Sequence, residues 1–460
     1  MFGSFSRLKL GALFGALIRM GTGVNGILIG ACLARLLSVE ALGLYFLFTR
    51  LVRLTAMVVA FGMPNGLQKV VGIAAGAGDW TGMRTTLRNA AGQFALTALA
   101  AGAIYLAAWP FLSERLFGGA LGPGIAAAIF VIVLLGAAER VVSAFFRAVR
   151  HYVLGVFLLG FPREAALVAI FGAMVLAGAA TEIDRVLLIH LAVVTATAAG
   201  GLALAWRFVA RHRGGDGRSV DPSFRAFALL CAPMGVNQVL GDLYNRFDIW
   251  VLGFFRPAAE VGVYGAVLTL TMVITFTLNI VTLLIPGVVA STYAKGELER
   301  LQRLMRAAAT ASLLMAIPFA AAYLAFGEAI LRLAFGPAFA AGATVLAILT
   351  VGRTVSAACG SPAVLLQMTG HHLLVVRITL AIAALILAAS LAVVGRYGPE
   401  GVATVTALGM IGRNLTMTAF ARHRVGIVTL PTLRPADLRD LVRFRAARRD
   451  RPPVDDAGDG

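Results

Sequence analysis

Long apolar segments separated by short polar stretches recur along the whole chain of 460 residues. A helix needs about 20 apolar residues to cross the hydrocarbon core of a membrane. Uninterrupted runs of this length favour helices over barrel strands, in which apolar and polar residues alternate. The pattern predicts twelve spans, over residues 10–35, 43–65, 88–110, 124–148, 153–178, 186–208, 226–254, 262–287, 305–326, 340–367, 373–395 and 400–421.

The composition agrees with an all-α integral membrane protein. Hydrophobic residues make up 59% of the chain and charged residues 13%, and the mean hydropathy is +0.87. Soluble proteins carry about 25% charged residues. The formal net charge of +18 is concentrated between the apolar runs, which is typical of cytoplasmic anchors on membrane helices. We therefore do not interpret this charge as a nucleic-acid-binding surface.

Loops rich in basic residues alternate along the chain with loops that are poor in charge. One set of loops is rich in Arg and Lys, whereas the intervening set, which includes "SVEA", "TEIDR" and "RPAAE", is short and poor in charge. Because basic loops remain on the cytoplasmic side, both termini are predicted to be cytoplasmic. An even number of spans requires the same arrangement.

An internal repeat divides the chain into two halves. The segment "GDWTGMRTTLRNAA" from Gly78 aligns with "GELERLQRLMRAAA" from Gly296, and Tyr45 pairs with Tyr264 at nearly the same offset. Each half holds six spans, so the repeats are parallel and a substrate site is expected between them. We predict two six-helix lobes around a central cavity, with the following boundaries: lobes at 1–208 and 226–424, a cytoplasmic linker at 209–225 and a basic cytoplasmic tail at 425–460.

The tail contains a short amphipathic pattern. Leu438, Leu441 and Val442 are spaced as on one helix face and lie among many arginines. This pattern predicts a short helix on the anionic inner leaflet, with a solvated basic tail as the alternative.

Several arginines lie inside predicted spans. Charges inside a membrane usually face a wet cavity or an ion partner. Arg50 and Arg53 are three residues apart and share a helix face, while Arg19 and Arg353 are mid-span in other helices. None of the four has an acidic residue within one turn, although partners on other helices are an alternative. Because guanidinium groups bind phosphate oxygens in paired hydrogen bonds, we interpret these arginines as candidate anion ligands in the cavity.

Other polar residues in the spans have simpler explanations. Arg246 has Asp242 four residues away on the same face, which predicts an ion pair, and the adjacent pairs Glu139–Arg140 and Arg163–Glu164 suggest internal pairing as well. Six residues are candidates for ligand binding or ion coupling, with helix-to-helix bonding as the alternative: Asn25, Asn237, Gln238, Asp242, Arg246 and Asp248.

Motifs for other chemistry are absent from the sequence. It contains no G-x-x-x-x-G-K-[ST] phosphate loop, no cluster of metal ligands and no nucleophile elbow, and its three cysteines are far apart. We expect no cofactor and no enzymatic activity. Energy for transport would come from a proton or monovalent cation gradient, or from the later fate of the cargo.

Two external turns resemble a known family. "LARLLSVEALGLYFLF" and "VLGFFRPAAEVGVYGAV" are similar to turns of the polysaccharide transporters in the multidrug/oligosaccharidyl-lipid/polysaccharide (MOP) superfamily, most of all the Wzx-type O-antigen flippases. The resemblance covers about residues 5–425. It implies two lobes that alternate access, an undecaprenyl-pyrophosphate-linked oligosaccharide as cargo for polysaccharide or lipopolysaccharide biosynthesis, and membrane lipids or a polysaccharide assembly complex as partners.

The charges in the spans and the lengths of the external loops disfavour several alternative functions. Lipid II flippases carry an arginine in the eighth span, but residues 262–287 hold no charge. A multidrug antiporter usually moves cationic cargo, which unpaired arginines would repel. A membrane glycosyltransferase or polymerase usually needs a large external loop, and every external loop here is short. A non-transporting scaffold for glycan assembly would leave the buried arginines without a purpose.

Overall fold

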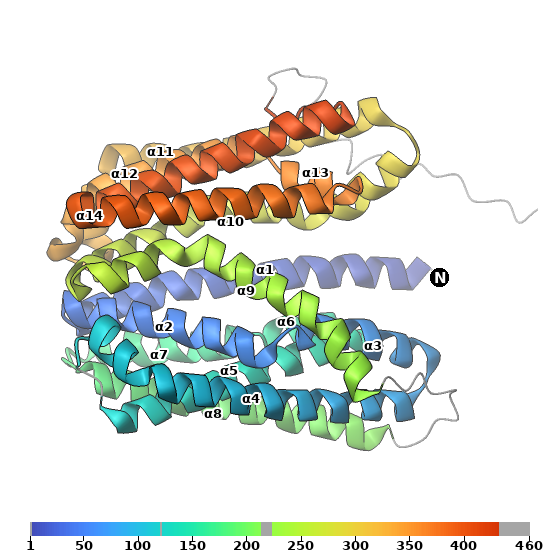
Figure 1. Ribbon diagram of the computed structural model, residues 1–460, viewed down its shortest axis with the longest axis horizontal. Helices are drawn as coiled ribbons and strands as arrows, with labels where there is room; N and C mark the ends of the chain where they lie inside the picture. Colours follow the sequence, from blue (N-terminus) through green and yellow to red (C-terminus); the bar gives the residue numbers. More distant parts are fainter. Residues whose placement is uncertain (1, 120–121, 213–222, 432–460) are drawn as a thin grey trace, which may run out of the picture. The chain divides into compact units, whose positions relative to one another are not determined.

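The computed structural model describes residues 2–119, 122–212 and 223–431, which are almost entirely helical (Figure 1). No strand occurs within these three segments. The helices, with one short 3₁₀ helix η1, are α1 (Phe2–Leu36), α2 (Val39–Ala60), α3 (Met63–Ala77), α4 (Trp80–Phe117), α5 (Pro123–Ala148), α6 (Tyr152–Phe157), α7 (Phe161–Leu176), α8 (Ile183–Arg211), α9 (Phe224–Phe255), α10 (Ala258–Ala294), α11 (Leu298–Phe335), η1 (Pro337–Gly342), α12 (Ala343–Ala358), α13 (Pro362–Met368) and α14 (His372–Val425).

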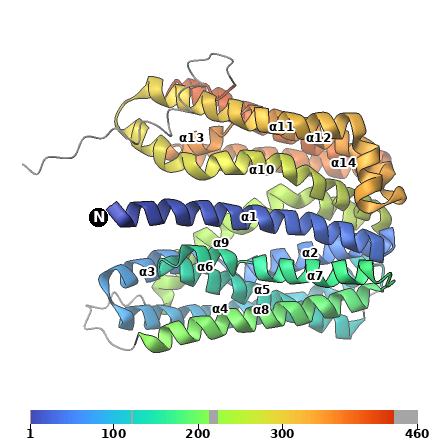
Figure 2. The same ribbon diagram turned by 180° about the vertical axis from the view of Figure 1, so that it is seen from behind.

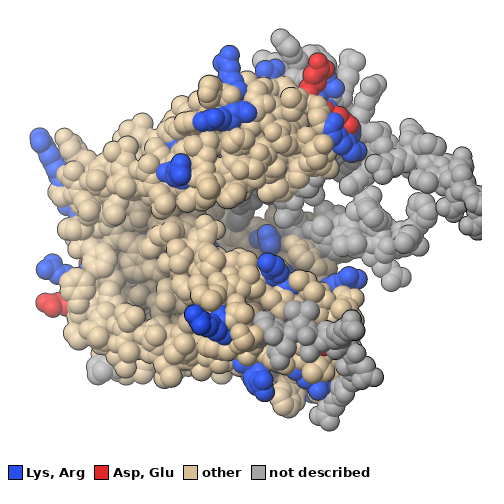
Figure 3. Space-filling model, turned by 45° about the vertical axis from the view of Figure 1, so that its right-hand side comes forward, with Lys and Arg blue, Asp and Glu red and all other residues tan. Residues whose placement is uncertain are grey.

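The helices confirm the predicted fold class of a multi-pass, all-α membrane protein. Nine helices in the described segments are long and apolar enough to cross a membrane. Every predicted span falls mainly on helical residues. The last two spans lie in α14, which bends where Gly398 leaves the helical conformation and Pro399 follows. On the face drawn in Figure 3, the described residues are largely uncharged, with scattered Lys and Arg side chains and few acidic ones.

Three predicted spans are broken, which corrects the expectation of continuous helices. The breaks carry the sequences "GMP", "GFP" and "GSP", beginning at Gly62, Gly160 and Gly360. Each glycine has a positive φ, of 74°, 123° and 67° respectively, and each proline lies in the first turn of the next helix. Glycine adopts positive φ without steric cost, and proline needs no hydrogen-bond acceptor at a helix start. Helix α3 therefore occupies a region predicted to be a loop.

Side chains of three residues fix the starts of other helices. Ser38, Asp79 and Ser223 precede α2, α4 and α9, and each accepts a hydrogen bond from a backbone N–H three residues further on. Such caps satisfy N–H groups that have no partner inside the helix. The caps set where α2 and α9 begin, and these two helices carry most of the candidate site.

Contacts divide the chain into two compact units. The first unit comprises Met1–Leu270, Glu328–Ala343 and Leu391–Val402, and the second comprises Thr271–Gly327, Thr344–Ser390 and Ala403–Gly460. The division into six-helix lobes at 1–208 and 226–424 stays a prediction. Residues 213–222 of the predicted linker lie outside the described segments. So do residues 432–460 of the predicted tail, together with its predicted amphipathic helix.

Each unit has its own apolar core. In the first unit, α5 packs against α2, α3 and α8, and α1 packs along α6 and α7 (Figure 2). Met63, Phe145 and Phe227 are among the buried side chains there. In the second unit, Met305 and Met417 are fully buried between α11 and α14. The chain after α14 docks beside α11, where Gln302 exchanges two hydrogen bonds with the backbone of Val428.

The repeat found in the sequence is visible in the local backbone. Helices α4 and α11 both contain 38 residues, and the glycines that precede them, Gly78 and Gly296, have φ angles of 72° and 71°. The turns after α5 and α13 also match, because Arg150 and Gly370 both have positive φ, of 66° and 88°. The repeated residues thus build the same turns. The superposition of whole lobes stays a prediction.

A close approach of two helices gives a test of this packing. Gly43 on α2 lies against the start of α10, where an added Cβ would overlap the carbonyl oxygen of Ala258 and approach Gly262 N. Because backbone atoms cannot move aside locally, we expect Gly43→Ala to lower the free energy of unfolding by about 2 kcal/mol. Unfolding in mixed detergent micelles measures the change. The control is Gly172→Ala on α7, where the Cβ meets no atom within 4 Å and no loss is expected. Equal losses in the two variants would contradict the close approach.

Candidate functional site

The two arginines of α2 are in different environments. Arg53 Nε donates a hydrogen bond to Asp242 Oδ1 on α9 at 3.0 Å. The Arg53 side chain is 46% exposed, whereas that of Asp242 is 8% exposed. For Arg53, the structure thus shows the alternative of an acidic partner on another helix. The partner is 189 residues away in the sequence, so no local spacing rule could identify it.

Arg50 lies one helical turn from Arg53 and is half-buried. Its Nε atom is buried and has no hydrogen-bond partner among the described residues. Arg50 is within electrostatic range of Arg53, Asp242 and Asp248. A guanidinium without a bonded acid inside a membrane segment is a strong candidate for binding an anion.

Helix α9 supplies two carboxylates, Asp242 and Asp248, near Arg50 and Arg53. The pairing of Arg246 with Asp242, predicted from their spacing, is confirmed at 4.0 Å between Arg246 Nε and Asp242 Oδ1. The same oxygen thus faces both Arg53 and Arg246. Asp248 is held differently, because it accepts hydrogen bonds from Tyr264 Oη and from the backbone N–H of Ile249, each at 2.9 Å.

A second ionic group lies among α5, α7 and α8. Glu139 accepts hydrogen bonds from Arg163 Nη1 at 2.5 Å and from Thr197 Oγ1 at 2.6 Å. Glu164 lies 3.9 Å from the other terminal nitrogen of Arg163. The predicted internal pairing of Arg163 is thus confirmed, with Glu139 on a neighbouring helix as the main partner. Thr197 gave no signal in the sequence, since its role depends on how the helices pack.

Arg140 joins the two ionic groups electrostatically. It follows Glu139 on α5 and is within electrostatic range of Arg53, Arg163 and Asp242. All of these residues belong to the first unit. The first unit therefore carries two ionic groups inside its apolar helices, with Arg140 within electrostatic range of both, and we call them together the charged network.

The remaining predicted site residues lie on α1, α9 and α12. Arg19 is exposed on α1 and is within electrostatic range of Arg147. Asn25 is half-buried on α1, and its Nδ2 atom is buried with no hydrogen-bond partner in the described part of the chain. On α9, Asn237 is exposed and Gln238 is half-buried. Arg353, half-buried on α12, belongs to the second unit.

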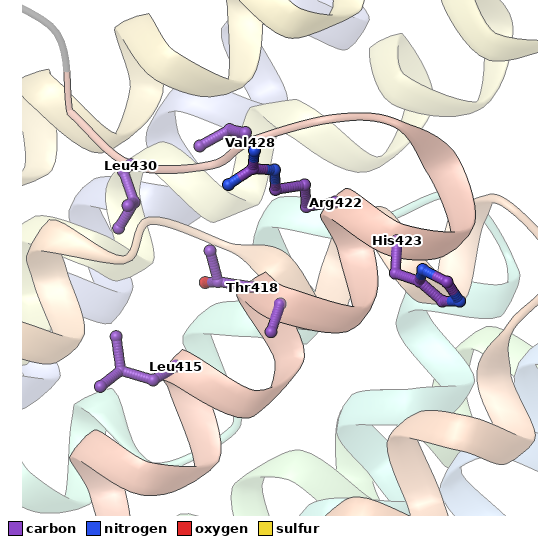
Figure 4. Close-up of a pocket in the computed structure, with 7 residues that line it drawn as sticks. Leu415, Thr418, Arg422, His423, Val428 and Leu430 are labelled. Atoms are coloured by element: carbon purple, nitrogen blue, oxygen red, sulfur yellow. The ribbon is translucent and has the colours of Figure 1, made fainter.

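A pocket of about 510 Å³ lies elsewhere, at the C-terminal end of α14 in the second unit. Figure 4 shows Arg422 directed toward Val428 and the segment that follows the helix, with Leu415 at the opposite end. The lining residues are Leu415, Thr418, Ala419, Arg422, His423, Val428 and Leu430. No predicted site residue lines this pocket, and we assign it no role.

The fold is the one found in transporters of the MOP superfamily. An inward-facing multidrug resistance MATE family transporter of that superfamily has a TM-score of 0.66 and 15% identity, over 89% of this chain and 98% of that chain. The lipid II flippase MurJ, in an inward closed conformation, has a TM-score of 0.59 and 13% identity, over 97% of this chain and 94% of that chain.

A third similar structure is a MOP superfamily transporter from Pyrococcus furiosus, for which a binding pocket of reverse polarity suggests a different function. Its TM-score is 0.53 at 14% identity, over 92% of this chain and 95% of that chain. No protein-family model matches the sequence, and no curated protein matches it. At these identities the likeness establishes the fold of a multi-pass membrane protein.

Proposed function

We propose that this protein is a transporter that moves an undecaprenyl-pyrophosphate-linked oligosaccharide from the cytoplasmic to the outer leaflet of a cell inner membrane. It would do so by alternating access, as a step of polysaccharide or lipopolysaccharide biosynthesis. The observation that carries the proposal is the cluster of arginines inside the first unit. Arg50 has a buried Nε without a hydrogen-bond partner in the described segments, and Arg53 beside it is about half exposed.

The balance of charges favours an anionic cargo. The network holds five guanidinium groups, Arg50, Arg53, Arg140, Arg163 and Arg246, and four carboxyl groups, Glu139, Glu164, Asp242 and Asp248. With all groups ionised, a positive charge remains. A pyrophosphate diester brings two negative charges and adjacent oxygens, which guanidinium groups bind in paired hydrogen bonds.

The second candidate is an ion-coupled multidrug antiporter, because MATE transporters are among the similar structures. Its usual cationic cargo would meet an excess of guanidinium groups, so the charges support the first candidate. The similarity in fold to the lipid II flippase MurJ supports a lipid-linked cargo. Arg19 and Arg353 are proposed as further cargo ligands. Asn25, Asn237 and Gln238 are proposed as glycan contacts.

Depletion of the protein in its host tests the function. We expect polyprenyl-pyrophosphate-linked oligosaccharide to accumulate on the cytoplasmic leaflet, where added glycan-modifying enzymes reach it in inside-out vesicles. Accumulation of the same lipid on the outer leaflet would assign the protein to a later step. An unchanged lipid pool together with increased sensitivity to cationic drugs would favour the antiporter.

The proposed orientation places both termini in the cytoplasm. It rests on the alternation of basic and charge-poor loops. A cysteine at Gly119, in the turn after α4, is expected to react with a membrane-impermeant maleimide in intact cells. A cysteine at Gly215, in the predicted linker, is expected to react only after the membrane is opened. The cysteine-free protein is the background for both variants, and labelling of position 215 in intact cells would reverse the orientation.

A further inference from the structure

We propose that Asp242 is a built-in competitor of the anionic cargo, which weakens cargo binding so that the cargo can leave. This inference rests on the proposed function, because it concerns the same arginines. A transport site must bind its cargo tightly enough to admit it and weakly enough to release it. A cluster of arginines without a carboxylate would hold a pyrophosphate too firmly for rapid turnover.

The position of Asp242 suits a competitor. Its Oδ1 atom faces Arg53 Nε at 3.0 Å and Arg246 Nε at 4.0 Å, so one carboxylate serves two guanidinium groups. Because the Arg53 contact uses Nε, the terminal nitrogens of Arg53 are not part of it. An anion bound to those nitrogens would lie within a few ångströms of the carboxylate, where like charges repel strongly in a site of low dielectric.

The two carboxylates of α9 are not equivalent in this respect. Asp248 is held by Tyr264 Oη and by its own helix backbone, which gives it a structural role independent of cargo. Among the described residues, the ion-pair contacts of Asp242 are with Arg53 and Arg246, and guanidinium groups are the groups that a phosphate would use. In the empty site Asp242 therefore separates two guanidinium groups that would otherwise repel each other. In the loaded site it competes with the phosphate for them.

The exposures of the side chains make an exchange feasible. The Arg53 side chain is 46% exposed and that of Asp242 is 8% exposed. An incoming anion can thus reach the guanidinium of Arg53 while Asp242 stays covered behind it. The cargo would bind first to Arg53 and the neighbouring Arg50, and the return of Asp242 to full contact would accompany release.

The test measures binding of farnesyl diphosphate to the full-length protein in detergent. Farnesol, which has the same tail and no charge, reports apolar binding. Asp242→Asn is expected to lower the Kd for farnesyl diphosphate about tenfold and to slow its dissociation, since a nearby like charge is removed. The same variant should transport lipid-linked glycan more slowly in proteoliposomes. Asp242→Ser gives a second neutral variant, so the result does not depend on the folding of one protein.

Two controls separate this role from a structural one. Asp242→Glu keeps the charge and should bind within about twofold of the unmodified protein. Glu260→Gln removes a carboxylate that pairs with Arg256 in a different part of the first unit, and its Kd should not change. Damage to the structure would weaken binding, so tighter binding with slower transport distinguishes a competitor from a structural residue.

The outcomes also separate the inference from the proposed function. If the unmodified protein binds farnesyl diphosphate more tightly than farnesol, but the neutral variants bind it equally or more weakly, Asp242 is not a competitor and the anion site remains. If the unmodified protein does not distinguish farnesyl diphosphate from farnesol, the anion site itself is wrong, and both proposals fail.

Discussion

Arg50→Gln is expected to reduce transfer of lipid-linked glycan at least about tenfold while the amount of protein in the membrane stays normal. A hydrogen bond to a charged group contributes about 1.5–3 kcal/mol, which corresponds to at least a tenfold effect if Arg50 binds the pyrophosphate. The protein should remain stable because Arg50 Nε has no hydrogen-bond partner among the described residues, and neutralising a charge inside a membrane segment lowers its insertion cost.

Arg53→Gln is the matched comparison, from the same face of the same helix. It removes the 3.0 Å partner of Asp242, and Arg246 Nε then remains within ion-pair distance of that oxygen, at 4.0 Å. We expect less protein as well as less transport, because a buried carboxylate loses its main partner. Arg50→Lys should retain part of the activity, since it keeps the charge but loses paired hydrogen bonding. Protein level and glycan export are measured together. Normal export by Arg50→Gln would exclude Arg50 from cargo binding.

The apolar pattern predicted the fold class because a helix that crosses a membrane needs about 20 apolar residues. A few polar or turn residues do not hide segments of this length. It predicted the positions of the spans but not their interruptions. The interruptions at Gly62, Gly160 and Gly360 carry a common signal, a glycine followed two residues later by proline. This signal is short and lies within otherwise apolar sequence, so a hydropathy profile does not detect it.

The repeat was predicted from turn residues, because turns constrain residue type more tightly than lipid-facing helices do. Gly78 and Gly296 have nearly the same φ, which few other residues adopt. The helices between such turns need only be apolar, and their identities drift. The alignment of the two halves therefore rests on turn residues, and the equal lengths of α4 and α11 agree with it.

The candidate site was only partly predictable. The rule for residues four apart on a helix identified Arg246 and Asp242. Contacts between helices follow no spacing rule, so the Arg53–Asp242 pair and the bonds of Glu139 were visible only in the structure. The sequence treated Arg50 and Arg53 as equivalent. The structure separates them, because Arg53 is bonded to an acid and Arg50 Nε has no hydrogen-bond partner among the residues described.

Glu139 is expected to be the residue of the network on which stability depends most. Its side chain is 5% exposed and accepts hydrogen bonds from Arg163 and Thr197, which lie on two other helices. Glu139→Gln removes the negative charge but keeps the shape. Among the described residues, Glu164 at 3.9 Å then remains as the acid within ion-pair distance of Arg163. Breaking a buried ion pair from one side costs about 3–5 kcal/mol, so we expect the free energy of unfolding to fall by about 3 kcal/mol.

A double-mutant cycle separates the lost pair from other damage. Removing both partners with Glu139→Gln and Arg163→Gln should recover part of the loss, because no uncompensated charge then remains buried. The control is Glu260→Gln, which breaks a salt bridge of 2.8 Å between side chains that are each 30% exposed. An exposed pair of this kind contributes less than about 1 kcal/mol. Unfolding in mixed detergent micelles measures all four proteins. A loss in Glu139→Gln no larger than that in Glu260→Gln would show that the pair between α5 and α7 does not stabilise the first unit.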